Sequence, residues 1–239
     1  LVNVARSAPH RSDLGLVTDW LATEMGRLGV FVHWGRTMDA AAVLAAHPDT
    51  VVVATGSWPR VDGLQRGAPG IRVDGVDLPH VVGPVEVLRD GAGKGVRRAL
   101  VFDDLGTYPA IGVTEHLLVA GVPVTLATSQ PMLGAELGPS LQRDPAAQRL
   151  GGYPGFTFVS RVALTRVEPG TATLRHLDSG VEQQEAADLV VLVTGFEPQH
   201  ALFDELRLLH PNVVIVGDAL APAYLGHAIA TGHRAGTTI

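Results

Sequence analysis

Three short, almost wholly apolar segments of this 239-residue chain each end in a turn that contains glycine. Continuous apolar runs of this length are typical of strands buried on both faces of a parallel sheet. In such sheets ligands lie at the carboxyl ends of the strands, where glycine lets the backbone approach a ligand closely because no Cβ intervenes. One glycine alone is explained by a turn, but three in this arrangement predict a nucleotide site. The segments and their turns are 50–54 with Thr55-Gly56, 189–193 with Thr194-Gly195, and 212–216 with Gly217-Asp218.

The composition excludes several classes of function. The chain carries 18 basic and 24 acidic residues, a formal charge of −6, and shows no basic stripe, which argues against a nucleic-acid partner. It has no cysteine, so it forms no disulfide and holds no thiolate nucleophile or iron–sulfur cluster of its own. No apolar run approaches the roughly 20 residues of a membrane helix, and no signal peptide is recognisable, so we expect a cytoplasmic location.

The periodicity of the remaining sequence predicts an α/β chain. Residues 98–128 follow the order strand, helix, strand, which predicts parallel neighbours with a right-handed crossover. Three later strands are separated by hairpin-type turns and predict an antiparallel meander. Residues 60–95 are interpreted as a connection and 131–155 as a loop. Helices are predicted at 13–29, 39–46, 85–89, 110–120 and from 225, and further strands at 30–34, 98–102, 122–128, 157–167, 171–177 and 181–184.

Several motifs resemble those of flavoproteins with two dinucleotide-binding domains. The stretch Ala54-Thr55-Gly56-Ser57-Trp58-Pro59-Arg60 resembles their ATG-x-x-P-R motif, and Thr194-Gly195-Phe196-Glu197-Pro198 resembles the second crossing between the domains. Residues 213–219, followed by Ala228-Ile229 and Gly232-His233-Arg234, resemble the closing flavin-site motif. The chain is similar to the C-terminal half of the trimethylamine dehydrogenase and 2,4-dienoyl-CoA reductase group, in which an old-yellow-enzyme-like barrel precedes this module. The Gly-His-Arg ending favours the amine dehydrogenase side.

The resemblance implies two Rossmann-like, three-layer domains. It places an FAD- or ADP-binding domain that lacks its first strands at 1–60 and 197–239, a connection at 61–96, and a degenerate NAD-binding-type domain with the meander at 97–196. It also implies FMN and a [4Fe-4S] cluster in the missing N-terminal barrel. The implied partners are a small-molecule substrate, an upstream barrel domain or complementary chain, and further copies in a homo-oligomer, with neither nucleic acid nor membrane.

The implied cofactor-binding residues lie at the strand ends and on the last helix. In the family, the aspartate at the position of Asp218 hydrogen-bonds the ribityl–phosphate region, and the start of the following helix faces a phosphate or the flavin ring. Backbone N–H groups and the helix dipole favour that negative charge. The alternative is that Asp218 only caps the last helix. No catalytic residue and no metal ligand is expected in this chain. The implied cofactor-binding residues are Ala54, Thr55, Gly56, Gly217, Asp218, Ala228 and Ile229.

The turn that opens the flavin domain in this family is absent from the chain. Its Gly-x-Gly-x-x-Gly motif, its first strand and the acidic residue for the ribose would all precede Leu1. Without them the apolar strands lack central neighbours and expose apolar faces. We therefore expect an upstream segment that carries them.

The corresponding nicotinamide-binding turn is degenerate. Counting back from Gly121, its three glycine positions fall on Leu105, Thr107 and Ala110, of which only alanine is an accepted substitute. Asp103-Asp104 at the strand end would repel a pyrophosphate. We therefore interpret the second domain as structural, so that NAD(P)H binding there is doubtful.

Other residues have simpler interpretations. Asp103 and Asp104 are interpreted as solvated turn residues. His10-Arg11 could reach a ligand from its loop, but solvated loop residues are the favoured interpretation. Tyr108 and Trp58 are interpreted as space-filling rather than as adenine-stacking residues.

The leading hypothesis is a nucleotide-binding module of a flavin-dependent oxidoreductase that acts on an amine or an enoyl-type substrate. Two alternatives stay open. One is a non-catalytic scaffold or docking module with a vestigial nucleotide site, and the other is a reductase domain that uses NADH.

Overall fold

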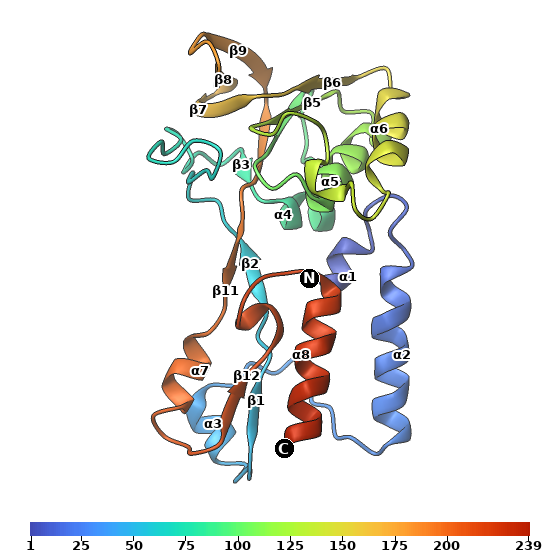
Figure 1. The fold of residues 1–239 in the computed structure, drawn as a ribbon, viewed down its shortest axis with the longest axis vertical. Helices are drawn as coiled ribbons and strands as arrows, with labels where there is room; N and C mark the ends of the chain where they lie inside the picture. The colour runs from blue at the N-terminus through green and yellow to red at the C-terminus, as the bar shows by residue number, and fades with distance from the viewer. The chain divides into compact units, whose positions relative to one another are not determined.

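The computed structural model describes residues 1–239 and divides the chain into two compact units (Figure 1). Unit 1 comprises residues 1–20 and 59–195, and unit 2 comprises residues 21–58 and 196–239. No helix combines the length and the apolar character needed to cross a membrane.

Unit 1 is built on a five-stranded parallel sheet. Neighbouring strands pair in register, with Leu189 opposite Ala99 and Ala99 opposite Val124. The helix α5 (Tyr108–Val119) joins two adjacent strands, which confirms the predicted parallel strand–helix–strand unit. The strands in sheet order are β3 (Val81–Val82), β10 (Leu189–Val193), β4 (Ala99–Asp103), β5 (Val124–Thr128) and β6 (Phe156–Val159).

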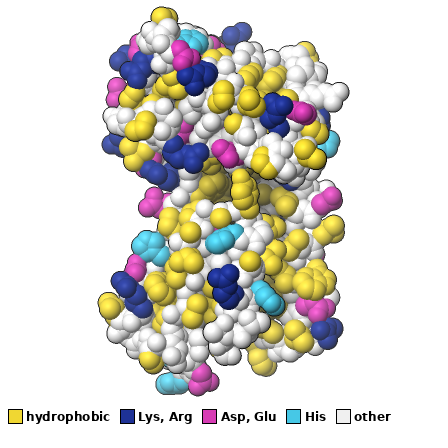
Figure 2. All heavy atoms as spheres, viewed as in Figure 1, with side chains coloured by type: hydrophobic (Ala, Val, Ile, Leu, Met, Phe, Trp, Pro, Cys, Tyr) yellow, Lys and Arg dark blue, Asp and Glu magenta, His cyan; other side chains and the backbone are white.

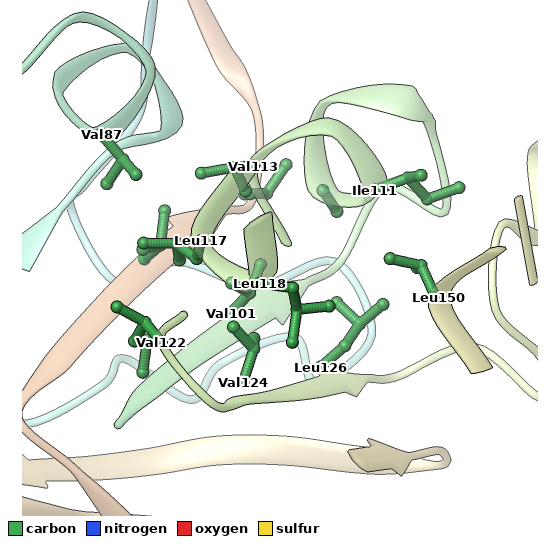
Figure 3. Packing of buried hydrophobic residues seen from close by; sticks show 14 of the residues in the cluster. Val87, Val101, Ile111, Val113, Leu117, Leu118, Val122, Val124, Leu126 and Leu150 are labelled. Carbon is green, nitrogen blue, oxygen red and sulfur yellow. The ribbon is translucent and has the colours of Figure 1, made fainter. Parts of the chain in front are cut away.

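Two separate apolar cores cover the two faces of this sheet. On one face, α5 packs Ile111 and Leu117 against the strands, as Figure 3 shows. On the other face, the antiparallel meander packs Leu164 and Leu174 against Phe102. The result is the predicted three-layer arrangement of helices, parallel sheet and meander. The meander strands are β7 (Val162–Glu168), β8 (Gly170–His176) and β9 (Glu182–Ala187), and the remaining helices of unit 1 are α1 (Val2–Ala5), α4 (Pro84–Asp90), η1 (Ala135–Leu137) and α6 (Arg143–Gly151).

Unit 2 has a much smaller sheet. Strand β1 (Val51–Val53) pairs in parallel with β12 (Val213–Ile215), and α3 (Ala40–Leu44) and α7 (Ala201–Leu206) supply the core on one face. The side chain of Asp39 caps α3 by accepting from Ala42 N at 2.8 Å. The unit also contains η2 (Gly217–Ala219) and α8 (Leu225–Thr238), while α2 (Leu14–Arg27) begins in unit 1 and ends in unit 2. A short two-stranded sheet pairs β2 (Ser57–Pro59) with β11 (Phe196–Pro198).

The other face of the β1–β12 pair is open. Val52 is 43% exposed and Val214 is 37% exposed, so the prediction that 50–54 is buried on both faces is wrong. Each strand of this sheet has one partner, which leaves the outward-pointing valines without a covering layer. Figure 2 shows apolar side chains spread over the face that unit 2 presents in this view.

Three other predicted elements differ from the structure. Residues 30–34 form no strand, since they pair with no other strand and Phe31 is 92% exposed. The predicted strand 157–167 is two strands, because Arg161 adopts a left-handed conformation (φ 57°) and the chain there leaves the parallel sheet for the meander. The predicted loop 131–155 contains α6, a helix with only two buried residues.

Candidate functional site

The carboxyl ends of β1 and β12 lie next to each other. The parallel register sets Val53 opposite Ile215, and Val216 N donates to Val53 O at 3.0 Å just beyond the last paired residues. The two turns that follow therefore start side by side. Both contain a glycine in the left-handed region, Gly56 with φ 78° and Gly217 with φ 62°.

Asp218 links the two turns. One carboxylate oxygen, Oδ2, accepts from Ser57 Oγ at 3.1 Å, and the other, Oδ1, accepts from Ala223 N at 3.2 Å. The alternative that Asp218 caps the last helix is wrong, because Tyr224 is the N-cap of α8 and no side chain caps that helix. The carboxylate fixes the segment between η2 and α8, and the first turn of α8 keeps its uncapped N–H groups.

Helix α8 is held closely against the end of β12. Thr231 Oγ1 accepts from Gly217 N at 2.9 Å, and a Cβ at Gly217 would lie 3.5 Å from Ala228 Cβ. Gly217 and Ala228 thus lie next to each other. Ile229, the next residue on α8, is 48% exposed.

The turn after β1 is tied to the residue that follows β11. Thr55 Oγ1 donates to Gln199 O, and Gln199 N donates to Gly56 O at 2.9 Å. Ala54 and Thr55 are exposed, and Gly56 is half-buried. The predicted residues of this turn therefore form an open, hydrogen-bonded bend rather than a buried one.

Two side chains of the site were not predicted. Ser57 is 4% exposed and donates to Asp218, and Thr231 receives the Gly217 N–H group. Ser57 carries a sequence signal, since a small hydroxyl residue follows Gly56 directly. Nothing in the sequence marks Thr231 except its place three residues after Ala228.

The third bend, at Gly195, belongs to unit 1. Its carbonyl accepts from Arg60 N at 2.9 Å. That the turns at Gly56, Gly195 and Gly217 together form one nucleotide site stays a prediction.

The two aspartates at the end of β4, Asp103 and Asp104, are not solvated, and this corrects the sequence interpretation. Asp103 is 2% exposed and Asp104 is fully buried. Burial raises the pKa of Asp103 to about 7, although two backbone N–H groups lower it.

A cavity of about 230 Å³ in unit 1 contains charged groups that the sequence did not indicate. Its lining includes His10, Glu115 and Arg149. Glu115 is fully buried on α5, and its two oxygens accept from Arg149 Nε at 3.0 Å and Nη2 at 3.2 Å. Hydrogen bonding to Glu115 raises the pKa of Arg149, as expected for a charge-assisted pair. His10 Nε2 lies 3.6 Å from Glu115 Oε1.

Arg11 is not a solvated loop residue either. Its guanidinium lies over the ring of Tyr108, 3.1 Å from the centroid, and donates to Gln142 Oε1 at 3.2 Å. This contact anchors the N-terminal segment on unit 1, while the Glu115–Arg149 pair joins α5 to α6. The role is structural, and spacing in the sequence could not reveal it, because the partners are 34 to 131 residues apart.

Comparisons with known proteins find relatives that are named as a demethylase, a dehydrogenase and an amine oxidase. The chain is 28% identical to a probable N-methylproline demethylase of Rhizobium meliloti (strain 1021) over 216 residues, which is 89% of this chain and 30% of that protein. It is 27% identical to the N,N-dimethylglycine/sarcosine dehydrogenase of Chromohalobacter salexigens over 210 residues, 86% of this chain and 29% of that protein. No family model matches the chain.

The structure of the 6-hydroxypseudooxynicotine amine oxidase from Pseudomonas geniculata N1 superposes with a TM-score of 0.92 at 27% identity, covering 98% of this chain and 36% of that one. The chain spans about 30% of the length of the curated relatives it matches. The fold is an α/β module with a parallel sheet and an antiparallel meander, and it is shared with this amine oxidase. The chain is homologous to amine dehydrogenases, demethylases and oxidases, so the resemblance drawn from its motifs is confirmed.

Proposed function

We propose that this chain is the nucleotide-binding module of a flavin-dependent oxidoreductase and that unit 2 holds FAD or ADP. The observation that carries the proposal is the meeting of the β1 and β12 ends, where Asp218 bridges the two glycine turns beside the start of α8. In open parallel sheets this is the edge at which ligands bind. The site residues are the seven named from the motifs, with Ser57 and Thr231 as supports.

The residues present fit part of a dinucleotide cradle. A Cβ at Gly56 would meet no atom within 4 Å, so the backbone there faces open space that a ligand can enter. The Asp218 carboxylate is suited to accept from a ribityl or ribose hydroxyl, while the uncapped N–H groups at the start of α8 suit a phosphate oxygen. A bound flavin would supply the electron-transfer chemistry. This chain's own part is to bind and orient the nucleotide.

The rest of the cradle would come from an upstream segment. Two observations support this: relatives are about three times as long, and the outer face of the β1–β12 pair exposes Val52 and Val214. We propose that this segment carries the glycine-rich turn and a barrel with FMN and a [4Fe-4S] cluster. The names of the relatives favour an amine over an enoyl-type substrate.

The proposal is tested by titrating the complete protein with ADP and with FAD, using calorimetry to count sites. We expect one adenine nucleotide per chain and at least a tenfold weaker affinity in Asp218→Ala, since one good hydrogen bond to a charged group is worth that much or more. Glu205→Ala, which removes an exposed carboxylate on α7 of the same unit, is the matched control and should bind normally. A protein that takes up no nucleotide would instead favour the scaffold alternative.

A further inference from the structure

The turn between β4 and α5 in unit 1 has a hydrogen-bond acceptor of its own, the side chain of Asp103. In α/β folds of this type, the N–H groups of such a strand-to-helix turn bind the phosphates of a dinucleotide. Here Asp103 Oδ1 accepts from Leu105 N at 3.0 Å and from Gly106 N at 2.9 Å. The last residue of β4 therefore already satisfies the donors that a phosphate would use.

The next carboxylate fixes a loop over the same sheet edge. Asp104 accepts from Arg66 N, from Gly67 N at 3.0 Å and from Ser129 Oγ at 2.7 Å. Ser129 follows the end of β5, so these bonds join the carboxyl ends of two neighbouring strands to the loop. We call residues 63–74 the strap.

The approach of the strap leaves no space beside Asp104. A Cβ at Gly67 would lie 2.9 Å from Asp104 Oδ1 and would overlap the side chain of Ser129. Only glycine allows the backbone to come this close. The strap therefore packs directly on the ends of β4 and β5, at Asp104 and Ser129.

The other side of the strap is held by the meander. The buried amide of Gln65 donates to Leu164 O at 2.7 Å and accepts from Leu164 N at 3.0 Å, next to the bulge in β7. Asp74 N donates to Thr165 O at 3.0 Å, and Val167 N donates to Asp74 O at 2.8 Å. The strap is thus bonded to the meander near both of its ends, at Gln65 and at Asp74. Within the strap, Val73 N donates to Gly63 O at 3.0 Å.

We propose that Asp103 is the internal ligand of the β4–α5 turn, in the place of a ligand phosphate, and that Asp104 and the strap close this edge of unit 1 to dinucleotides. The inference concerns unit 1 alone and does not depend on the function proposed for unit 2. Asp103, Asp104 and the strap together exclude dinucleotides from unit 1, and the loss of the glycines alone would not produce this exclusion.

The first test is chemical rescue of Asp103→Ala at pH 8, above the pKa of the wild-type carboxyl of about 7. Removing the carboxylate leaves two buried N–H donors facing a space that formate can enter. We expect a lower Tm that formate raises by about 3 °C or more relative to chloride at equal ionic strength, with no such gain in the wild type. If Asp103→Ala does not fold, Asp103→Ser replaces it, and the same rescue is expected.

The matched control is Asp188→Ala. Asp188 also accepts from a backbone donor, Arg97 N at 3.0 Å, but its carboxylate is open to solvent and encloses no space. Formate should therefore not raise its Tm. Equal gains in both variants, or no gain in either Asp103 variant, would overturn the internal-ligand assignment.

The second test addresses closure directly, by NADH fluorescence titration of the wild type and of Asp218→Ala in saturating ADP. We expect no NADH binding under these conditions. NADH that binds with the same affinity whether or not Asp218 and ADP are present would occupy unit 1 and overturn the proposal. NADH binding that Asp218→Ala abolishes would assign that nucleotide to unit 2 and leave unit 1 closed.

Discussion

The two units bury their strands to very different degrees. Every residue of β4 and β10 in unit 1 is buried, because helices cover one face of the five-stranded sheet and the meander covers the other. In unit 2 the β1–β12 pair has a core on one face only, and its outward valines are exposed. Strands with the same apolar pattern are thus buried on both faces in unit 1 and on one face in unit 2. Burial on both faces needs covering layers, and only unit 1 contains both layers within this chain.

The largest expected effect is on the core of unit 1. Phe102→Ala removes a fully buried ring and should lower the free energy of unfolding by about 3–5 kcal/mol, measured by urea denaturation. Phe31→Ala, the matched change at a side chain that is 92% exposed, should stay within about 0.5 kcal/mol. Similar losses in the two variants would contradict the contrast between the units.

The second prediction concerns pH. Burial holds the folded-state pKa of Asp103 at about 7, above its ordinary value of 3.8. The folded protein therefore binds the proton more tightly than the unfolded chain, so stability should fall as pH rises from about 4 to about 7 and level off above. The loss is on the order of a few kcal/mol, and Asp103→Asn should remove it from a series of urea denaturations. An unchanged slope in that variant would refute the assignment.

The third prediction concerns the ion pair between Glu115 on α5 and Arg149 on α6. Arg149→Ala leaves the fully buried Glu115 carboxylate without its cation and should cost about 3 kcal/mol, the lower end for such pairs because the arginine is partly exposed. Arg27→Ala, which breaks the exposed pair with Glu24 on α2, should cost about 0.5 kcal/mol or less. A double replacement of Glu115 and Arg149 by leucine should recover most of the loss.

The smallest expected effect separates adjacent residues of β1. Val53 is 3% exposed and packs in the core of unit 2, so Val53→Thr should cost about 1–2 kcal/mol by burying a hydroxyl group. Val52→Thr, on the open face, should change stability by less than about 0.5 kcal/mol. If an upstream segment does cover that face, Val52→Thr becomes costly when measured in a longer protein that includes it.

Local patterns predicted most elements of the fold. Each of these elements was predicted from a periodicity or a turn within one short stretch of the sequence: the parallel strands, α5, the meander and α8. The errors fall where the outcome depends on distant partners. Residues 30–34 have a strand composition but no strand to pair with, and Arg161 interrupts a segment that reads as continuous.

The candidate site was predictable only in part, for the same reason. Gly56, Gly217 and Ala228 follow from motif positions, and the structure brings them to one edge of unit 2. Asp103 and Asp104 were misinterpreted because two adjacent acids normally indicate a solvated turn. Asp103 accepts from backbone N–H groups of its own turn, and Asp104 accepts from donors of the strap and of the residue after β5, which no local pattern reveals.

The tight packing at Gly67 has a use beyond this molecule. Because any side chain at that position would displace the loop, a glycine there, combined with paired aspartates at the end of the strand that corresponds to β4, forms a signature that can be searched for in other chains. In sequences that carry this signature, the domain that corresponds to unit 1 should not bind a dinucleotide. In sequences that have glycines in place of the two aspartates, that domain should bind one.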